Sequence, residues 1–319
     1  MKYINEMHES DRLKDVYLCK SCQSAQTKTG KTYWNVTLQD KTGAVNAKVW
    51  EPDSPGIAEF GAGDYIWVGG EVVVFNNANQ VNIRQARKAT EGEYSPADYV
   101  PCTEKDIDEM YAALMKLVES VRAPYMKSLL KHYFDDADFK KRFCFHSAAK
   151  SVHHGFVGGL LEHTLSVAET CDYFSGHYEY LDRDLLLTAA ILHDIGKLRE
   201  ISPYPENDYT DEGQLLGHIM IGAHEISNTI DGIEGFPKVK RDELIHCILA
   251  HHGELEFGSP KKPALAEAIA LSFADNTDAK LQTMKEALNN NSGPYGIAWQ
   301  GFNKFLDSNI RRTSPLRDE

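Results

Sequence analysis

Histidine and aspartate residues recur beside apolar positions in the second half of the sequence. His163 has Leu160 and Val167 at helical spacing, and His193 and Asp194 follow the apolar run 185–192. An imidazole or carboxylate buried among such neighbours is unfavourable unless it is paired or bound to a cation. Each one alone is more typical of a hydrogen-bonded core residue. The whole set comprises His163, His193, Asp194, His218, His251 and Asp275.

Together these residues supply neutral imidazole nitrogens and anionic oxygens, a mixture that suits Mn, Fe, Co or Zn. One carboxylate can bridge two cations through its two oxygens. Two metals about 3.5–4 Å apart can activate water and hold the attacking and leaving oxygens of a phosphate. The set therefore predicts a metal centre for the hydrolysis of phosphate esters.

Five short motifs occur in a fixed order along this half of the chain. They are LEHT at 161–164, LHDIGK at 192–197, GH at 217–218, AHHG at 250–253 and ADN at 274–276. In this order they resemble the motifs of the HD-domain phosphohydrolase superfamily. The HD dipeptide alone would be a weak signal, but five spaced motifs are a strong one.

The elements that precede these motifs have the period of strands. Apolar residues alternate with polar ones around 33–38 and 45–50, and turn sequences separate the runs. Further strands are expected at 16–25, 65–74 and 81–84, with a short helix at 57–60. Three strands, a helix and two strands is the order of the OB-fold, a small barrel that often holds single-stranded oligonucleotides.

In this register the apolar residues fill the barrel and a mixed aromatic and polar set faces outward. Bases stack on aromatic rings and lysines contact phosphates, so this set is a candidate nucleic-acid-binding surface. It comprises Tyr33, Asn35, Lys48 and Trp50, with Arg84 on the last expected strand. The alternative is that the rings pack against the next domain or cap the barrel. The barrel pattern alone favours neither, because OB-folds also bind proteins and sugars.

The period changes after a polar segment that we expect to be a linker. Apolar residues such as Ile107, Met110 and Leu114 then recur at helical spacing, and helices are expected to about residue 310. The predicted fold class is multidomain α+β. It has an OB-fold barrel at 1–92, a linker at 93–103 and an all-α HD-domain bundle at 104–319, with the motif core at 150–285.

The whole arrangement resembles the YhaM family of 3′-to-5′ exoribonucleases over about residues 13–290. The resemblance implies two divalent metal ions, with Mn²⁺ the first choice and Fe²⁺, Co²⁺ or Zn²⁺ as alternatives. It implies that His163, His193, Asp194 and Asp275 hold one ion, and that Asp194, His218 and His251 hold the second. Asp194 would then bridge the two ions.

Several residues near the motifs have two interpretations. Lys197 could stabilise negative charge on the scissile phosphate beside Asp194, or be an ordinary lysine at a helix C-terminus. His251 is expected to be a ligand in preference to His252, because successive helical residues point about 100° apart unless the helix ends there. His153, His154 and His252 are candidates to line a nucleotide pocket, and the alternative for His153 and His154 is a loop pair.

Composition limits the classes of protein. The chain has 319 residues and a net charge of −13, which argues against a protein that coats nucleic acid through bulk positive charge. No apolar run approaches the ~20 residues of a membrane span, and the polar N-terminal residues do not resemble a signal peptide. The six dispersed cysteines predict no disulfide framework and fit a cytoplasmic location. Cys19 and Cys22 are expected to be buried strand thiols, because no second pair completes a zinc site.

The favoured hypothesis is an exonuclease that feeds a single-stranded RNA 3′ end to a metal centre and releases 5′-mononucleotides. Single-stranded DNA is an open alternative substrate, and homo-oligomerisation is left open. One rival is an HD-domain hydrolase of nucleotides or cyclic dinucleotides with a regulatory barrel. Another is a single-strand-binding protein without catalysis.

Overall fold

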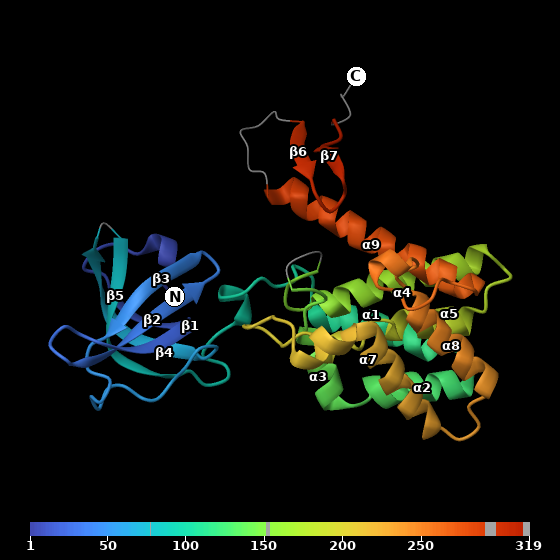
Figure 1. The fold of residues 1–319 in the computed structure, drawn as a ribbon, viewed down its shortest axis with the longest axis horizontal. Coiled ribbons are helices and arrows are strands. Elements are labelled where there is room, and N and C mark those ends of the chain that lie inside the picture. Colours follow the sequence, from blue (N-terminus) through green and yellow to red (C-terminus); the bar gives the residue numbers. More distant parts are fainter. Residues whose placement is uncertain (77, 151–153, 291–297, 315–319) are drawn as a thin grey trace. The chain divides into compact units, whose positions relative to one another are not determined.

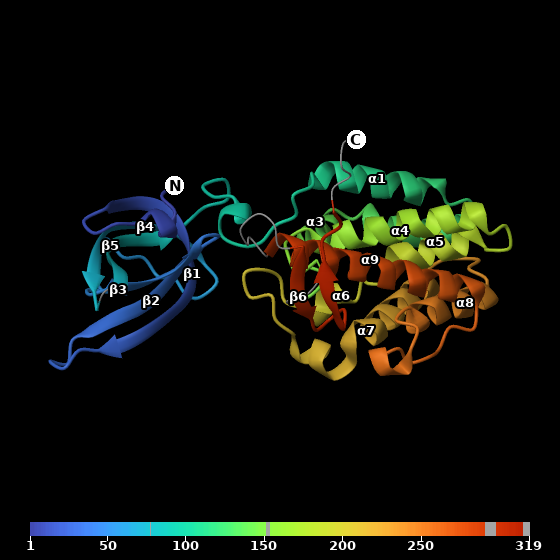
Figure 2. The same cartoon turned by 90° about the horizontal axis from the view of Figure 1, so that it is seen from above.

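The computed structural model describes residues 1–76, 78–150, 154–290 and 298–314 (Figure 1, Figure 2). The chain divides into two compact units, Met1–Cys102 and Thr103–Glu319. The first is built mainly of strands and the second mainly of helices. The expected fold class, a small barrel followed by a helical bundle, is confirmed.

The first unit is a closed five-stranded barrel. Its strands are β1 (Arg12–Gln26), β2 (Thr32–Asp40), β3 (Gly43–Val49), β4 (Tyr65–Phe75) and β5 (Ala78–Lys88), in the order β1-β2-β3-β5-β4. β1 is long enough to pair with β4 through its first half and with β2 through its second half, on either side of Leu18. The parallel pairing of β3 with β5 closes the barrel. This is the topology of the OB-fold.

The alternating residues fill the barrel as the sequence predicts. Val36 and Leu38 of β2 and Val45, Ala47 and Val49 of β3 are all buried. The prediction of two buried thiols is correct for Cys19, which is buried, but not for Cys22, which is half-buried.

The helix expected at 57–60 is wrong. This segment has no regular structure apart from an isolated bridge between Ile57 and Ala86, and Phe60 packs its ring edge-on against Trp34. Apolar residues in a short segment suggest a helical face, but here Ile57 and Phe60 pack against the barrel core instead.

The segment 93–103, expected to be a linker, packs largely on the barrel. The ring of Tyr94 stacks on Tyr65 at 4.0 Å, and the buried Tyr99 donates a hydrogen bond to the carbonyl oxygen of Val16. A 3-10 helix, η2 (Pro96–Asp98), lies between the two tyrosines. The division between the two units therefore lies near the end of this segment, after Cys102.

The second unit contains the helices that carry the histidine and aspartate motifs. They are α1 (Ile107–Ser120), α2 (Pro124–Phe134), α3 (Ala137–Phe145), α4 (Gly159–His177), α5 (Arg183–Leu192), α6 (Lys197–Glu200), α7 (Asp211–Asp231), α8 (Lys238–Ala250) and α9 (Ala266–Asn290). Two further 3-10 helices are η1 (Ile4–Glu6) in the first unit and η3 (Leu255–Phe257) in the second.

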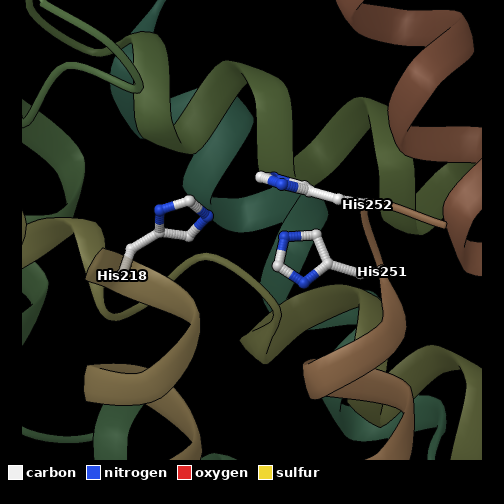
Figure 3. A group of neighbouring side chains, drawn as sticks. All are labelled: His218, His251 and His252. Atoms are coloured by element: carbon white, nitrogen blue, oxygen red, sulfur yellow. The ribbon is translucent and has the colours of Figure 1, made fainter. Parts of the chain in front are cut away.

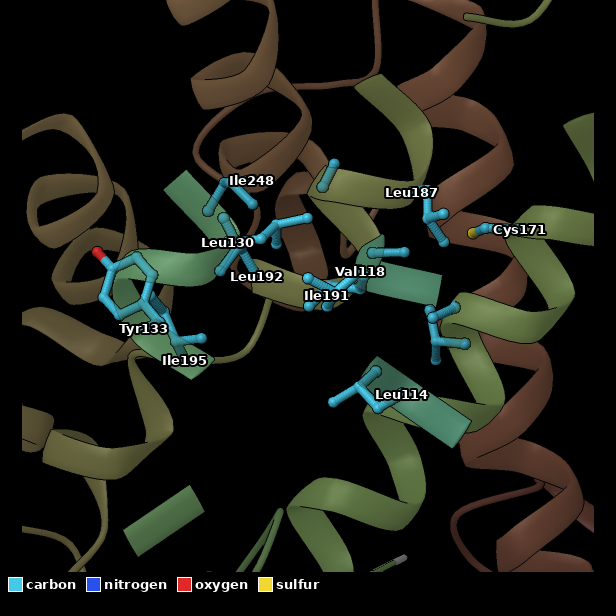
Figure 4. Packing of buried hydrophobic residues seen from close by; sticks show 14 of the residues in the cluster. Leu114, Val118, Leu130, Tyr133, Cys171, Leu187, Ile191, Leu192, Ile195 and Ile248 are labelled. Carbon is cyan, nitrogen blue, oxygen red and sulfur yellow. The ribbon is translucent and has the colours of Figure 1, made fainter. Parts of the chain in front are cut away.

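Helix α5 is the centre of this unit. Asp182 caps its N-terminus by accepting a hydrogen bond from the Leu185 backbone N–H, and every residue from Leu185 to Leu192 is buried. A helix that is apolar all round is typical of a core position. Figure 4 shows Ile191 of α5 among side chains from the surrounding helices, including Leu114 of α1, Leu130 of α2 and Ile248 of α8.

The C-terminal end departs from the prediction that helices continue to about residue 310. After α9 the chain forms a two-stranded hairpin of β6 (Trp299–Asn303) and β7 (Ser308–Arg311), which packs on α9. The two strands have only five and four residues, too few for an alternating pattern to stand out in the sequence after a long helix. Among the helices that the structure describes, none is both long and apolar enough to cross a membrane.

Candidate metal centre and nucleic-acid interface

The predicted ligands converge in the helical unit from five separate elements. The buried helix α5 ends at Leu192, so the next two residues, His193 and Asp194, begin inside the core with 0% and 2% exposure. α4 contributes His163, α9 contributes Asp275, α7 contributes His218, and His251 caps the C-terminus of α8.

The two carboxylate oxygens of Asp194 divide these residues into two groups. Oδ2 lies 3.4 Å from His163 Nε2 and 3.3 Å from His193 Nε2, and His163 Nε2 lies 3.3 Å from Asp275 Oδ1. Oδ1 lies 3.5 Å from His218 Nε2 and 3.8 Å from His251 Nε2. One carboxylate therefore faces two separate clusters of imidazole nitrogens.

Two of the imidazole rings are fixed by backbone carbonyls on their own helices. His193 Nδ1 lies 2.8 Å from the carbonyl oxygen of Ala190, and His251 Nδ1 lies 2.7 Å from that of Ile248. A carbonyl can only accept, so Nδ1 carries the proton in both rings. In the neutral rings the Nε2 lone pairs then point toward Asp194.

The other two rings are fixed by carboxylates that the sequence did not single out. His163 Nδ1 donates to Asp278 Oδ2 at 2.7 Å, and His218 Nδ1 donates to Glu200 Oε1 at 3.0 Å. Partners of this kind orient metal-binding histidines and set their tautomer. Asp278 lies three residues after Asp275 on one helix face, and this spacing is the signal that could have found it.

Unpartnered buried atoms show that these residues fit a bound cation. Asp194 Oδ1, His218 Nε2 and His251 Nε2 are buried and have no hydrogen-bond partner among the described residues. Buried polar atoms are normally satisfied, and lone pairs from three side chains facing one another cannot satisfy one another. The mixed nitrogen and oxygen donors suit a divalent transition metal.

The electrostatics of the centre favour ionised carboxylates. Burial raises the pKa of Asp194, but the charges of Lys197 and His193 and the hydrogen bond from His163 outweigh it and hold this pKa well below its usual value. Burial lowers the pKa of His163, yet hydrogen bonds to three aspartates hold it well above its usual value. A cation at Nε2 of His163 would therefore replace a proton.

Lys197 lies in the centre rather than on the surface. Its Nζ is 2.7 Å from Asp194 Oδ2, and its side chain is 13% exposed. Burial lowers the pKa of Lys197, but Asp194 raises it above its usual value, so the ammonium keeps its charge. Lys197 is the first residue of α6, which is only one turn long, so it also lies in the last turn of that helix.

His251 and His252 both point toward His218, as Figure 3 shows. Ligand atoms of the three rings lie within 4.8 Å of one another. The two adjacent rings can share a direction because α8 ends at Ala250 and the chain turns at Gly253, whose φ is +79°. His252 therefore belongs to the same cluster as the expected ligand.

Of the two other candidates, His154 lies beside the centre and His153 lies outside the described residues. His154 is 2% exposed, and its Nε2 donates to Asp278 Oδ2 at 2.8 Å. It therefore shares Asp278 with His163. His154 is a buried partner of that carboxylate.

Two glycines bring α7 to the centre. At Gly217 the helix is kinked, with φ +70° and ψ 155°, a conformation that only glycine adopts readily. The kink lets the backbone N–H of His218 donate to Glu200 Oε1, the oxygen that also accepts from its ring. A Cβ on Gly196 would overlap the His218 carbonyl oxygen, so the HDIGK glycine permits close approach of α7.

The barrel carries most of the predicted nucleic-acid-binding residues on one connected surface. The rings of Tyr33 and Trp50 lie 5.2 Å apart, and Lys48 Nζ is 5.1 Å from the Tyr33 ring. Lys48 also donates to Asn35 Oδ1 at 2.8 Å. Trp50 is 47% exposed, so one large ring is open to solvent.

Two features of this surface differ from the sequence-based set. Trp50 Nε1 donates to Asn82 of β5, which the sequence did not identify because the parallel pairing of β3 with β5 could not be read from it. Arg84 is exposed and forms an ion pair with Glu71, and no described contact joins it to the aromatic pair.

A barrel of OB topology and a buried cluster of imidazoles and carboxylates together define a metal-dependent phosphohydrolase of the HD class. The HD domain family model matches residues 160–280, which include every residue of the two clusters around Asp194.

The chain belongs to the family of the 3′-5′ exoribonuclease YhaM. It is 33% identical to the YhaM protein of Bacillus licheniformis over 287 residues, which cover 88% of this chain and 90% of that protein. A solved structure of the second OB-fold domain of replication protein A from Methanococcus maripaludis is also similar. Its TM-score is 0.23 at 17% identity, and the match covers 29% of this chain and 98% of that one.

Replacing Gly217 with alanine should destabilise the helical unit. A side chain at φ +70°, ψ 155° costs about 1–3 kcal/mol or forces His218 away from Asp194. The measurement is urea unfolding followed by the helical circular dichroism signal, together with Mn²⁺ affinity. The control is Gly176→Ala in α4, where a Cβ meets nothing within 4 Å and alanine should be neutral or stabilising. Unchanged stability and unchanged Mn²⁺ affinity for Gly217→Ala would contradict this account of the kink.

Replacing Asp278 with asparagine should weaken metal binding without unfolding the protein. The amide keeps an acceptor for His163 but loses the charge that makes Nε2 a stronger ligand. The expected loss is about 10–100-fold in Mn²⁺ affinity, measured by calorimetry. Glu286→Gln on the same helix is the control, since Glu286 accepts from Gln282 and contacts no histidine in the described structure. Equal Mn²⁺ affinities for the two variants would show that Asp278 has no such role.

Proposed function

We propose that this protein is a metal-dependent 3′-to-5′ exoribonuclease that hydrolyses phosphodiester bonds of single-stranded RNA and releases 5′-mononucleotides. The observation that carries the proposal is the convergence of two imidazole clusters on Asp194 in a member of the YhaM family. A B. licheniformis relative of nearly the same length is named as a 3′-5′ exoribonuclease.

The residues present would hold two divalent ions. His163, His193 and Asp275 would hold the first with Asp194 Oδ2, and His218 and His251 would hold the second with Asp194 Oδ1. His252 lies close enough to join the second group. Mn²⁺ is the first choice, and Fe²⁺, Co²⁺ and Zn²⁺ fit the same donors. When bound, the ions supply Lewis acidity toward a water and a phosphate oxygen.

The remaining steps fall to the side chains of this protein. Lys197 keeps its positive charge beside Asp194 and can stabilise the negative charge that develops on the phosphate oxygens. Asp278 and Glu200 hold His163 and His218 in the tautomer that presents Nε2. Burial of the ligands keeps their geometry fixed, so little reorganisation is needed during the reaction.

The barrel supplies a binding surface for single-stranded RNA. Bases can stack on the exposed face of Trp50 beside Tyr33, and Lys48 can contact a phosphate. A cytoplasmic location is part of the proposal and is supported by six free cysteines.

The purified protein with Mn²⁺ should shorten a 5′-labelled RNA oligomer progressively from its 3′ end and release 5′-mononucleotides. Asp194→Ala should abolish this activity, because both groups of ligands lose their shared carboxylate. Gel electrophoresis of the label and chromatography of the products measure the two outcomes. Asp172→Ala, at an aspartate of α4 that pairs with Arg183, is the control expected to stay active.

Three results would count against the proposal. Wild-type protein that leaves RNA intact but hydrolyses nucleotides or cyclic dinucleotides would favour a nucleotide phosphohydrolase with a regulatory barrel. Protein that binds RNA, but binds no metal and hydrolyses none of these substrates, would favour a non-catalytic binding protein. Full activity of Asp194→Ala would place the chemistry elsewhere. A parallel assay with single-stranded DNA tests whether the enzyme requires ribose in its substrate.

Replacing Trp50 with alanine should weaken single-stranded RNA binding by about 5–150-fold, the equivalent of one stacking interaction of ~1–3 kcal/mol. Fluorescence anisotropy with a labelled oligomer measures the affinity. Phe75→Ala serves as the control, because Phe75 is an exposed aromatic residue of the barrel with no described ring partner. If both variants bind RNA as tightly as wild type, the Trp50 surface does not bind RNA.

A further inference from the structure

The C-terminal hairpin exposes three large aromatic side chains. Trp299 is 57% exposed, Phe302 63% and Phe305 68%. Trp299 and Phe302 belong to β6, and Phe305 lies in the turn before β7. Burying such rings is favourable, and three rings that are each more than half exposed in one short element mark a candidate binding surface.

The charge of the hairpin is opposite to that of the unit it belongs to. Lys304, Arg311 and Arg312 are exposed on the hairpin against one acidic residue, Asp307. Elsewhere in the helical unit acidic residues outnumber basic ones. Arg311 pairs with Trp299 across the two strands, and its guanidinium lies 6.0 Å from the indole ring. One small element thus carries both aromatic rings and cations, and Arg311 lies over one of the rings.

The hairpin is held in place on α9 rather than left loose. Ile310 is 3% exposed, and Arg312 Nη2 donates to the carbonyl oxygen of Leu288 on α9 at 2.6 Å. Leu288 lies ten residues after Asp278 on the same helix, which places it about 15 Å along the helix axis from the carboxylate that orients His163. The aromatic surface therefore has a fixed position on the catalytic unit.

We propose that the hairpin is a second binding site for single-stranded RNA, carried by the catalytic unit itself. Bases stack on Trp299, Phe302 and Phe305, and Lys304 and Arg311 contact phosphates. Aromatic rings interleaved with cations are the chemistry that binds single strands without reading their sequence. The negative charge of the backbone complements the local positive charge of the hairpin. The proposal rests on the RNA substrate proposed above.

The test compares full-length wild type with the variants Trp299→Ala, Phe302→Ala and Phe305→Ala. Each should weaken binding of a single-stranded RNA oligomer, by about tenfold for each ring that no longer stacks on a base. Lys304→Gln should lower the salt dependence of binding by about 0.7 in the slope of log K against log salt. Tyr180→Ala, at a 75% exposed aromatic residue of the α4–α5 loop, is the matched control and should bind like wild type.

A dinucleotide substrate separates binding from chemistry, because it is too short to extend the about 15 Å along α9 that separate Asp278 from the hairpin contact at Leu288. The hairpin variants should hydrolyse it at the wild-type rate while they lose activity on long RNA. Unchanged RNA affinity in all three aromatic variants would overturn the proposal. If wild type sediments as an oligomer, and the hairpin variants sediment as monomers but bind RNA as tightly as wild type, the hairpin is a protein interface instead.

These results also distinguish the inference from the function on which it rests. Wild-type protein that shortens RNA, with hairpin variants that bind it equally well, would refute only the hairpin site. Wild-type protein that does not shorten RNA, yet binds it in a hairpin-dependent way, would refute only the proposed exonuclease activity.

Discussion

An ionised carboxylate buried at the end of an apolar helix is the constraint on which the helical unit depends. Asp194 is 2% exposed and follows α5, whose apolar residues fill the core. Taking such a charge out of water costs several kcal/mol, even after the protein relaxes around it. The cost is offset only if cations or donors surround both oxygens. Lys197 and the raised-pKa ring of His163 meet this need at Oδ2. Oδ1 faces Nε2 of His218 and His251 without a hydrogen bond, so a bound cation is what would satisfy it.

The same constraint explains why residues outside the centre matter. A ring can offer Nε2 to a cation only if its Nδ1 proton has a partner, so Asp278 and Glu200 are required beside His163 and His218. Glu200 in turn can reach His218 only because α7 bends at Gly217. Backbone geometry, side-chain tautomer and ligand position are thus set by one chain of contacts.

The sequence predicted what is encoded locally. Asp194 stood out because a polar pair ended an apolar run, and the barrel followed from alternating residues between turns. Asp278 and Asn82 did not stand out, because their partners lie far away in sequence and are defined only by tertiary packing and by the parallel pairing of β3 with β5. The sequence favoured His251 over His252 as a ligand, but the directions of both rings depend on the residue at which α8 ends, and this end could not be placed from the sequence.

The metal centre is acidic, whereas the surfaces proposed to bind RNA carry basic and aromatic residues. Asp194, Asp275, Asp278 and Glu200 surround the metal centre with carboxylates. Lys197 forms a close ion pair with Asp194, and the cited contacts of the other three carboxylates are to histidines. A phosphate would be repelled from such a site unless divalent ions reversed the local charge. The acidity that counts against bulk nucleic-acid binding is therefore what cation binding requires. Attraction for the RNA backbone must then come from elsewhere, and the barrel surface around Lys48 and the basic, aromatic hairpin have the composition to provide it.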